Sequence, residues 1–315
     1  MRFIRSHRTL FPLVVLGIIL VAATAVLAGT AWYASGGTLG INPPRGVAHH
    51  APASFNRALT FHSNSMDVDV GVTVYTPPGY NPNDTNTRYP VIYFLHGGQG
   101  DDWNYLSTFN RNAPSGSSLY DPNGNPNLLA FIESGLVPPA IVVMPNGGSR
   151  SGFLDNPPVL SETMIITELI PFIDANYNTV PLGGWRAIEG NSMGGFGALN
   201  FAFEHSSLFC GVLAYGPGVG IPGEDTQFED VEYVQRLRAN ENEIKENGLQ
   251  IRSVIADFGE PNPIRPYQEQ LSALLTELEI AHERIILTEP EVGHNLVTKY
   301  RATLPNGDNA GRDSA

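Results

Sequence analysis

Hydrophobic residues along the chain follow two patterns that alternate over most of its length. Some runs are short and continuously apolar, as in strands buried on both faces, and others repeat apolar residues at helical spacing. The continuously apolar strand-like runs are 90–95 and 140–144. The run 70–75 alternates apolar with other residues, and 251–256 and 284–288 are two further short strand-like runs. The helix-like runs are 161–177 and 266–280. This alternation predicts an α/β fold with a mostly parallel central sheet and helices on both faces. Ser161 is the predicted cap of the first helix.

The segment Gly190-Asn191-Ser192-Met193-Gly194 lies between a short strand-like run, 185–189, and a helix-like run, 195–203. It fits the pattern G-x-S-x-G, in which a sharp turn from strand to helix exposes the serine and the glycines let neighbouring backbones approach. The serine would stand at a helix N-terminus, where free N–H groups favour negative charge. The pattern predicts a nucleophile, although a glycine-rich turn without chemistry is the alternative because short motifs recur by chance.

A serine nucleophile needs a base, and ligands in such sheets bind at the carboxyl ends of the strands. Three histidines follow Ser192 in the sequence. His205 lies at the far end of the helix after the serine, and His282 precedes the last predicted strand. His294 follows that strand at the correct edge, so His294 is the predicted base, with a surface loop histidine as the alternative.

The carboxylate that orients His294 is expected after the strand 251–256. Asp257 leaves the strand at once and would equally cap the turn. Glu260 lies further out, where a loop can curl toward His294. Glu260 is therefore the preferred acid, and Asp257 stays open as the alternative.

Backbone N–H groups are expected to form an oxyanion hole, because a tetrahedral intermediate carries negative charge on oxygen. One predicted donor is the N–H of Met193, directly after the nucleophile. The other is Gly98, or its neighbour Gly97, in the loop after the strand 90–95. The adjacent His96 has no second histidine at ligand spacing, so a structural role is predicted for it and no metal site is expected.

The charge and the cysteine content of the chain limit the ligands and partners that it is expected to bind. The net charge of −13 disfavours binding to nucleic acid, because an acidic surface repels phosphate. The chain has one cysteine, Cys210, so neither an intramolecular disulfide nor a C-x-x-C metal site can form. Cys210 lies in an apolar run and is predicted to be a small buried hydrophobe. Neither a metal nor an organic cofactor is expected.

The N-terminus carries an export or anchoring signal. Three arginines in the first eight residues precede an apolar run over residues 10–34. The run is longer than the ~7–15 residues of a usual signal h-region and near the ~20 residues that span a bilayer. Because Ala23-Thr24-Ala25 fits a cleavage pattern, a signal peptide and a retained anchor both stay open. In either case the remaining chain is expected outside the cytoplasm, secreted or associated with the membrane through residues 10–34.

The chain therefore divides into four predicted parts. Residues 1–34 are the signal peptide or membrane anchor, 35–54 a linker, 55–302 one domain and 303–315 a flexible tail.

Four segments together resemble the family known as putative esterase, or esterase D, within the α/β-hydrolases. They are the strand and turn 72–80, the strand and loop 89–98, the helix segment 168–174 and the turn 190–195. The resemblance covers residues 55–300, although Asn191 stands where the family usually has Leu or His. It implies an α/β-hydrolase fold, a Ser-acid-His triad and an ester substrate, and it supports Ser192 and His294. The family's acid usually stands in Gly-x-x-Asp. Here Glu260 stands at the Asp position of this pattern and Asp257 at its Gly position. This comparison favours Glu260 as the acid and leaves Asp257 as the alternative.

That family includes feruloyl and acetylxylan esterases, S-formylglutathione hydrolase, siderophore esterases and mycolyltransferases. The sequence thus predicts a serine carboxylic-ester hydrolase for small-molecule or polysaccharide-linked esters, with carbohydrate-linked or aromatic acyl esters favoured outside the cytoplasm. An acyltransferase of the mycolyltransferase kind is the first alternative, and a non-catalytic binding protein of the same fold is the second.

Asn191 and Trp103 are predicted to contact substrate, although Trp103 would equally serve to pack its loop. The same loop also carries Asp101, Asp102 and Tyr105, which with Trp103 could stack on a sugar or an aromatic acyl group. The loops expected to set specificity are 99–126, 147–158 and 217–247.

Overall fold

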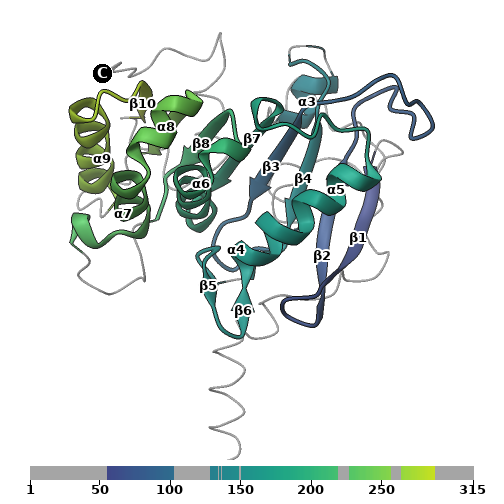
Figure 1. Cartoon of the computed structure of the whole chain (residues 1–315), viewed down its shortest axis with the longest axis horizontal. Helices are drawn as coiled ribbons and strands as arrows, with labels where there is room; N and C mark the ends of the chain where they lie inside the picture. The colour runs from purple at the N-terminus through teal and green to yellow at the C-terminus, as the bar shows by residue number, and fades with distance from the viewer. Residues whose placement is uncertain are drawn as a thin grey trace, which may run out of the picture.

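The structure is a computed structural model that describes residues 55–102, 128–133, 135, 137–148, 150–218, 227–256 and 264–287. The described residues form an eight-stranded sheet with the strand order β1-β2-β4-β3-β7-β8-β9-β10 (Figure 1). The strands are β1 (Phe55–Ser63), β2 (Val68–Tyr75), β3 (Val91–Leu95), β4 (Ile141–Pro145), β7 (Arg186–Asn191), β8 (Gly211–Tyr215), β9 (Gln250–Ala256) and β10 (His282–Leu287).

The sheet is mostly parallel, as the sequence predicts. β1 pairs antiparallel with β2, and β2 pairs antiparallel with β4, whereas the neighbours from β4 to β10 all run parallel. The parallel strands β3 and β4 are almost completely buried, which explains their continuous apolar runs. Polar residues interrupt β1 at the edge of the sheet, so the apolar pattern does not reveal that strand.

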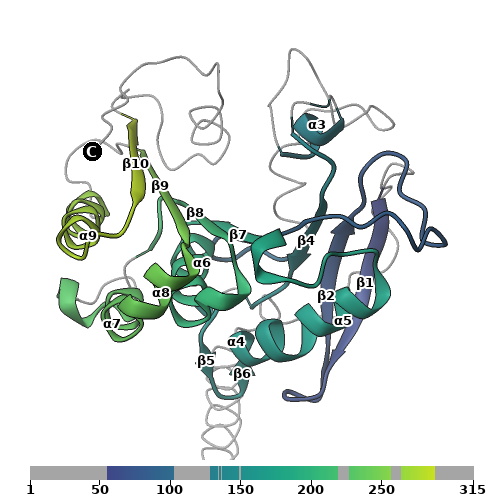
Figure 2. The ribbon, with the colours of Figure 1, turned by 45° about the horizontal axis from the view of Figure 1, so that its top comes forward.

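Helices cover the sheet on both faces. They are α3 (Leu128–Glu133), a continuous segment made of α4 (Ser161–Thr163), the π-helical η2 (Met164–Leu169) and α5 (Ile170–Asn176), then α6 (Met193–Glu204), α7 (Glu232–Ala239), α8 (Glu241–Asn247) and α9 (Arg265–Glu277). The connections that carry the chain from β4 to β7 and on to β10 all advance in one direction, whereas the connection from β3 to β4 advances in the other. Right-handed crossovers then place α3 opposite the remaining helices. Figure 2 shows α4 to α8 on one side of the sheet and α3 on the other.

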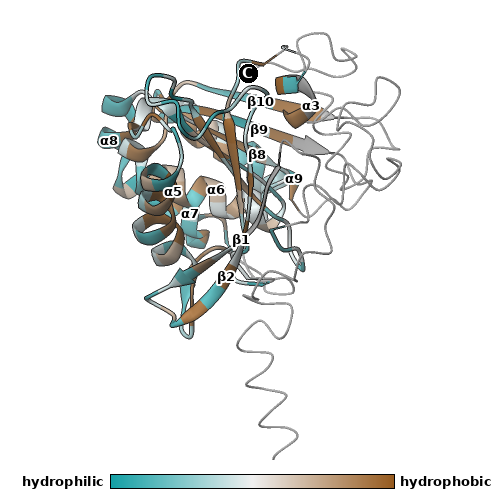
Figure 3. Cartoon of the chain, turned by 90° about the vertical axis from the view of Figure 1, so that its right-hand side faces the viewer, coloured by the Kyte–Doolittle hydropathy of each residue, from teal (hydrophilic) through white to brown (hydrophobic). Residues whose placement is uncertain are grey.

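Shorter elements join these layers. The hairpin strands β5 (Asp155–Asn156) and β6 (Val159–Leu160) precede α4, and 3-10 turns lie at η3 (Gly183–Trp185), η4 (Ser206–Leu208) and η5 (Phe228–Asp230). Trp185 thus belongs to a turn and not to the strand predicted at 185–189. Figure 3 shows mostly apolar strands in the sheet, whereas α5 and α8 carry both polar and apolar residues.

Helix α6 lies at the centre of the core. Every residue from Gly194 to Phe203 is buried, so the helix is covered on all sides. It packs against β7, β8 and β3 on the sheet and against α7 on its other side. This central position holds the segment before it, which contains Ser192, in a fixed place at the carboxyl ends of the strands.

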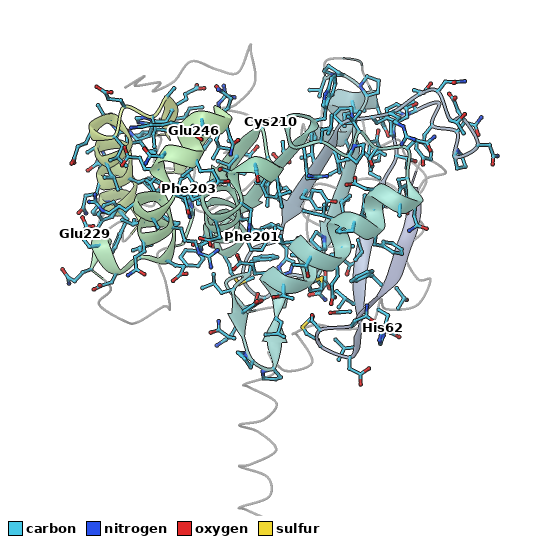
Figure 4. All side chains as sticks on the ribbon, in the orientation of Figure 1. His62, Phe201, Phe203, Cys210, Glu229 and Glu246 are labelled. Atoms are coloured by element: carbon cyan, nitrogen blue, oxygen red, sulfur yellow. The ribbon has the colours of Figure 1, made fainter. Side chains whose placement is uncertain are left out.

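Two local predictions from the sequence are corrected. Ser161 does not cap the helix, because the N-cap position is Leu160 and the Ser161 hydroxyl donates to the carbonyl of Gly147 instead. Cys210 is only half-buried, at the end of the sheet shown in Figure 4. It immediately precedes β8, and its N–H donates to the carbonyl of Arg186.

The N-terminal and C-terminal predictions are not tested by the fold. The segments 1–34, 35–54 and 303–315 lie outside the described residues. Within the described ranges, none of the helices has the length and apolar character that crossing a membrane requires.

Glu189 is an acidic residue buried inside β7. A Cβ on the next residue, Gly190, would point at α6, so Glu189 faces the opposite side of the sheet. It helps to line a groove there of about 520 Å³, together with Leu213 and Arg252. One carboxyl oxygen accepts from the Tyr215 hydroxyl at 3.3 Å, and the other has no hydrogen-bond partner among the described residues. Burial raises the pKa of Glu189 to about 8, so the neutral acid is the form favoured at neutral pH.

This raised pKa predicts that the fold loses stability as the pH rises. Between the ordinary pKa of 4.5 and the raised pKa of about 8, the folded state holds a proton that the unfolded chain has already released. The stabilisation is therefore complete below pH ~4.5, falls steadily as the pH rises, and is fully lost above about pH 8. Glu189→Gln removes this titration. We expect the free energy of unfolding of the variant, relative to the parent protein, to rise by roughly 3 kcal/mol between pH 5 and pH 8. Urea unfolding at several pH values measures it.

Glu246→Gln on α8 is the matched control, because Glu246 is exposed (Figure 4). It should leave the pH dependence as it is in the parent protein. A Glu189→Gln variant whose pH dependence equals that of this control would contradict the assignment of a neutral buried carboxyl.

Candidate active site

Ser192 sits in a strained turn between β7 and α6. Its backbone angles are φ 57° and ψ −117°, a region that residues with a side chain rarely adopt. Three backbone hydrogen bonds hold this conformation. The Ser192 N–H donates to the carbonyl of Tyr215 at 2.8 Å, and the Ser192 carbonyl accepts from the N–H groups of Phe196 and Gly218, both at 3.0 Å. The strained geometry is therefore imposed by the sheet and the helix around it.

The two outer glycines of the motif are required by close backbone contacts. A Cβ on Gly190 would lie 2.2 Å from the carbonyl oxygen of Gly194, and a Cβ on Gly194 would lie 2.0 Å from the carbonyl oxygen of Leu95. Neither contact can be relieved by a side-chain rotation, because the obstacle is backbone. Only glycine lets α6 start directly against β7 and the end of β3, as the sequence predicts.

Ser192 precedes the first turn of α6, where backbone N–H groups have no acceptor within the helix. The N–H of Met193 is one of these groups, and the helix dipole adds to their preference for negative charge. Ser192 itself is only half-buried, so a ligand can reach it. This part of the site combines an accessible hydroxyl with donors for an anion.

The loop after β3 lies beside this turn. Gly97 is buried, and a Cβ on it would lie 3.4 Å from the side-chain nitrogen Nδ2 of Asn191 and 3.8 Å from Cβ of Ser192. Gly98 follows and is exposed. The structure thus brings the loop with the predicted second oxyanion donor next to the candidate nucleophile, although the two are far apart in the sequence. The half-buried Asn191 faces Gly97.

His96 has the structural role that the sequence predicts. It is 2% exposed; its Nδ1 lies 2.8 Å from the carbonyl oxygen of Gly97, and its Nε2 lies 3.2 Å from the N–H of Gly147. Since Nε2 accepts from a backbone N–H, the ring proton belongs to Nδ1, which donates to Gly97. Burial lowers the pKa of His96 and so favours the neutral ring. Both ring nitrogens serve the backbone of the site.

The two histidines set aside from the sequence lie where they were expected. His205 caps the far end of α6 and pairs with Glu162, with 2.9 Å between Nε2 and Oε1. His282 is the first residue of β10, and its Nε2 lies 2.7 Å from the hydroxyl of Ser272. Both are at the end of their element remote from the Ser192 turn.

The remaining site predictions are untested. His294, Glu260, Asp257 and Trp103 lie outside the described residues. The strands that lead to them do end at a common edge: in the parallel pair of β9 and β10, Ala256 is the register partner of Leu287. The strand that precedes Asp257 in the sequence and the strand that precedes His294 therefore end next to each other.

Two buried side chains near the site differ from what the sequence suggests. Asp102 was expected in a loop that could contact a sugar, but it is 9% exposed and accepts from the Thr73 hydroxyl at 2.8 Å. Phe153 lies in a loop expected to set specificity, yet it is completely buried. The isolated apolar residue in the Gly- and Ser-rich sequence 147–153 was the one signal that could have singled it out.

The groove beside Glu189 is lined by sheet residues and by α3, and its lining contains neither Ser192 nor Gly97. Among the described residues, no group of three His, Cys, Asp or Glu side chains is placed to hold a metal ion.

Comparisons with known proteins agree with this geometry. A sequence model of the family described as "Putative esterase" matches residues 63–242. "Esterase Rv1288" of Mycobacterium tuberculosis is 33% identical over 164 residues, which cover 50% of this chain and 31% of that protein. An "Endo-1,4-beta-xylanase/feruloyl esterase" of Xylanibacter ruminicola is 30% identical over 187 residues, which cover 56% of this chain and 23% of that protein. The chain thus spans less than a third of the length of these relatives.

Solved structures show the same fold. A ferulic acid esterase superposes with a TM-score of 0.59 at 19% identity, covering 78% of this chain and 97% of that one. A ferulic acid esterase from the anaerobic fungus Anaeromyces mucronatus superposes with a TM-score of 0.55 at 18% identity, covering 83% and 94%. The mostly parallel sheet with its helices is therefore an α/β-hydrolase fold. Since the family model also matches more than half of the sequence, the chain belongs to the Putative esterase family.

Proposed function

We propose that this chain is a serine carboxylic-ester hydrolase with Ser192 as its nucleophile. The observation that carries the proposal is the turn at Ser192: a strained, half-buried serine at the start of α6, with the Gly97 loop against it. Family membership supports the same chemistry.

The reaction begins when the Ser192 hydroxyl attacks the acyl carbon of an ester. His294 takes the hydroxyl proton as the Ser–acyl bond forms, and it gives that proton to the leaving alcohol when the tetrahedral intermediate collapses. Water then attacks the acyl-enzyme with the same base, which releases the acid and restores the serine. Glu260 orients His294, with Asp257 as the alternative.

Negative charge on the carbonyl oxygen of the intermediate is held by the N–H groups of Met193 and Gly98. Each such donor contributes about 3–4 kcal/mol to the stabilisation of the transition state. The start of α6 supplies the first donor together with its dipole. The common edge of β9 and β10 supports the arrival of the acid and the base near this point.

The substrate is an ester of a small molecule or a polysaccharide, with an aromatic or carbohydrate-linked acyl group favoured. This class is supported by similar proteins, among them an endo-1,4-beta-xylanase/feruloyl esterase of Xylanibacter ruminicola and the ferulic acid esterases with solved structures. The apolar N-terminal run supports action outside the cytoplasm, either as a secreted protein or as one attached to the membrane through residues 10–34. Asn191 and Trp103 are the proposed substrate contacts.

Removal of the nucleophile should abolish turnover. Ser192→Ala is expected to lower kcat for p-nitrophenyl acetate by at least about 10³-fold, because no other group takes the acyl chain. Ser207→Ala, at an exposed serine in η4, is the matched control and should keep full activity. Parent turnover no faster than that of Ser192→Ala would refute the hydrolase. Faster release of p-nitrophenol when a sugar is added as acceptor, accompanied by formation of the acylated sugar, would show a transferase instead.

The acid of the triad can be identified by a pair of isosteric variants. Glu260→Gln should lower kcat by about 10³–10⁴-fold, because the amide no longer holds the base in its required tautomer. Asp257→Asn should change kcat by less than about tenfold. Steady-state kinetics on the same ester measures both variants. The reverse ranking would assign the role to Asp257, and a small effect of both would exclude this loop as the source of the acid.

A further inference from the structure

We propose that Phe153 and His96 are positioning residues for the oxyanion hole, and this inference rests on the proposed function. Phe153 supports the ring of His96, and His96 fixes the carbonyl of Gly97. That carbonyl in turn sets the direction of the Gly98 N–H. The loop that contains Phe153 would then act on the rate of the reaction as well as on its specificity.

Phe153 fills the space between the loop after β4 and helix α6. It is completely buried and has a φ of 60°, which is uncommon for a residue with a large side chain. A Cβ on Gly147 would lie 2.1 Å from the ring of Phe153, and a Cβ on Gly197 would lie 2.6 Å from the Cβ atom of Phe153. Glycine on both sides is what allows the ring to enter. Its edge-on contact with Phe201, at 6.4 Å and 90°, fixes the third side.

The ring of Phe153 packs directly on the ring of His96. The two centroids are 5.1 Å apart with an angle of 57° between the planes. Phe153 also contacts Gly147. The N–H of Gly147 donates a hydrogen bond to Nε2 of His96, and the carbonyl of Gly147 accepts one from the hydroxyl of Ser161. His96 is therefore held by a ring on one face and by a fixed peptide at one nitrogen.

The other nitrogen of His96 holds the oxyanion loop. The carbonyl of Gly97 accepts from His96 Nδ1 at 2.8 Å and from the N–H of Gly100 at 3.0 Å. In a planar trans peptide, the N–H of Gly98 points opposite to the carbonyl of Gly97. The two bonds that fix the carbonyl thus fix the donor. Consecutive glycines would otherwise let this peptide turn easily, and an oxyanion donor is effective only when it is already oriented.

The competing explanation is that Phe153 only fills the core. A core residue would affect the free energy of unfolding and leave the chemical step unchanged at temperatures where the protein is folded. A positioning residue would lower kcat more than it raises KM, because the oxyanion exists only in the transition state. The two explanations therefore differ in a measurable ratio.

Phe153→Leu and Phe203→Leu form a matched pair for this measurement. Both phenylalanines are completely buried, and Phe203 lies near the far end of α6 (Figure 4). Assayed well below both melting temperatures, Phe153→Leu should lower kcat for p-nitrophenyl acetate about tenfold or more, with KM within about threefold. Phe203→Leu should keep kcat within about twofold while it loses a similar amount of thermal stability.

Substitutions of His96 provide the second readout. His96→Asn keeps an N–H donor close to the position of Nδ1, whereas His96→Leu removes it. We expect the Asn variant to retain a kcat several-fold above that of the Leu variant, with similar KM values. Equal kcat values for the two variants would contradict the role of the bond to Gly97.

The outcomes separate the two proposals. If the parent protein is active and Ser192→Ala is not, but Phe153→Leu loses no more kcat than Phe203→Leu, the positioning role alone is overturned. If the parent protein is no faster than Ser192→Ala, the hydrolase and the positioning role fail together.

Discussion

The close approach of helix α6 to the ends of β3 and β7 is the constraint on which the rest of this structure depends. The backbone of Gly194 lies so near the carbonyl of Leu95 that any side chain there would collide with it. This contact brings the first turn of α6 against the sheet, forces Ser192 into its positive φ and places the serine beside the Gly97 loop. The free N–H groups of α6 and the loop after β3 meet at one point because two backbones can touch.

The strain at Ser192 is sustained by packing on several sides. The α6 helix is buried along nearly its whole length, and Tyr215 and Gly218 bond the turn from the neighbouring strand and its loop. Behind the turn, Phe153 enters between two glycines and meets His96. The opposite face of β7 carries a different feature, the buried Glu189, which faces away from α6. Strand β7 thus leads to the proposed nucleophile Ser192 at its end and carries Glu189, whose titration affects the stability of the fold, on the face away from α6.

How far the sequence predicts this structure depends on whether the cause is local. The central strands were found because burial on both faces demands continuous apolar runs, and the Ser192 turn was found because its glycines are required within five residues of one another. The edge strand β1 was missed because only one of its faces needs apolar residues. Ser161 was taken for a helix cap, but its hydroxyl serves the distant carbonyl of Gly147. Phe153 was missed for the same reason, since its partners His96, Gly197 and Phe201 come from segments far away in the sequence. His294, Glu260 and Asp257 lie outside the described residues and stay predictions, because the meeting of side chains far apart in the sequence is set by tertiary packing that the sequence does not display.

Covalent labelling of the nucleophile tests the central claim most directly. The folded protein would be treated with a fluorophosphonate, which phosphonylates a serine only where a base and an oxyanion hole activate it, and the modified peptide would be identified by mass spectrometry. The account predicts a single stoichiometric label on Ser192 that is absent after unfolding in urea and absent from the Ser192→Ala variant. A folded protein that takes no label, or that carries it on a different residue, would contradict the account.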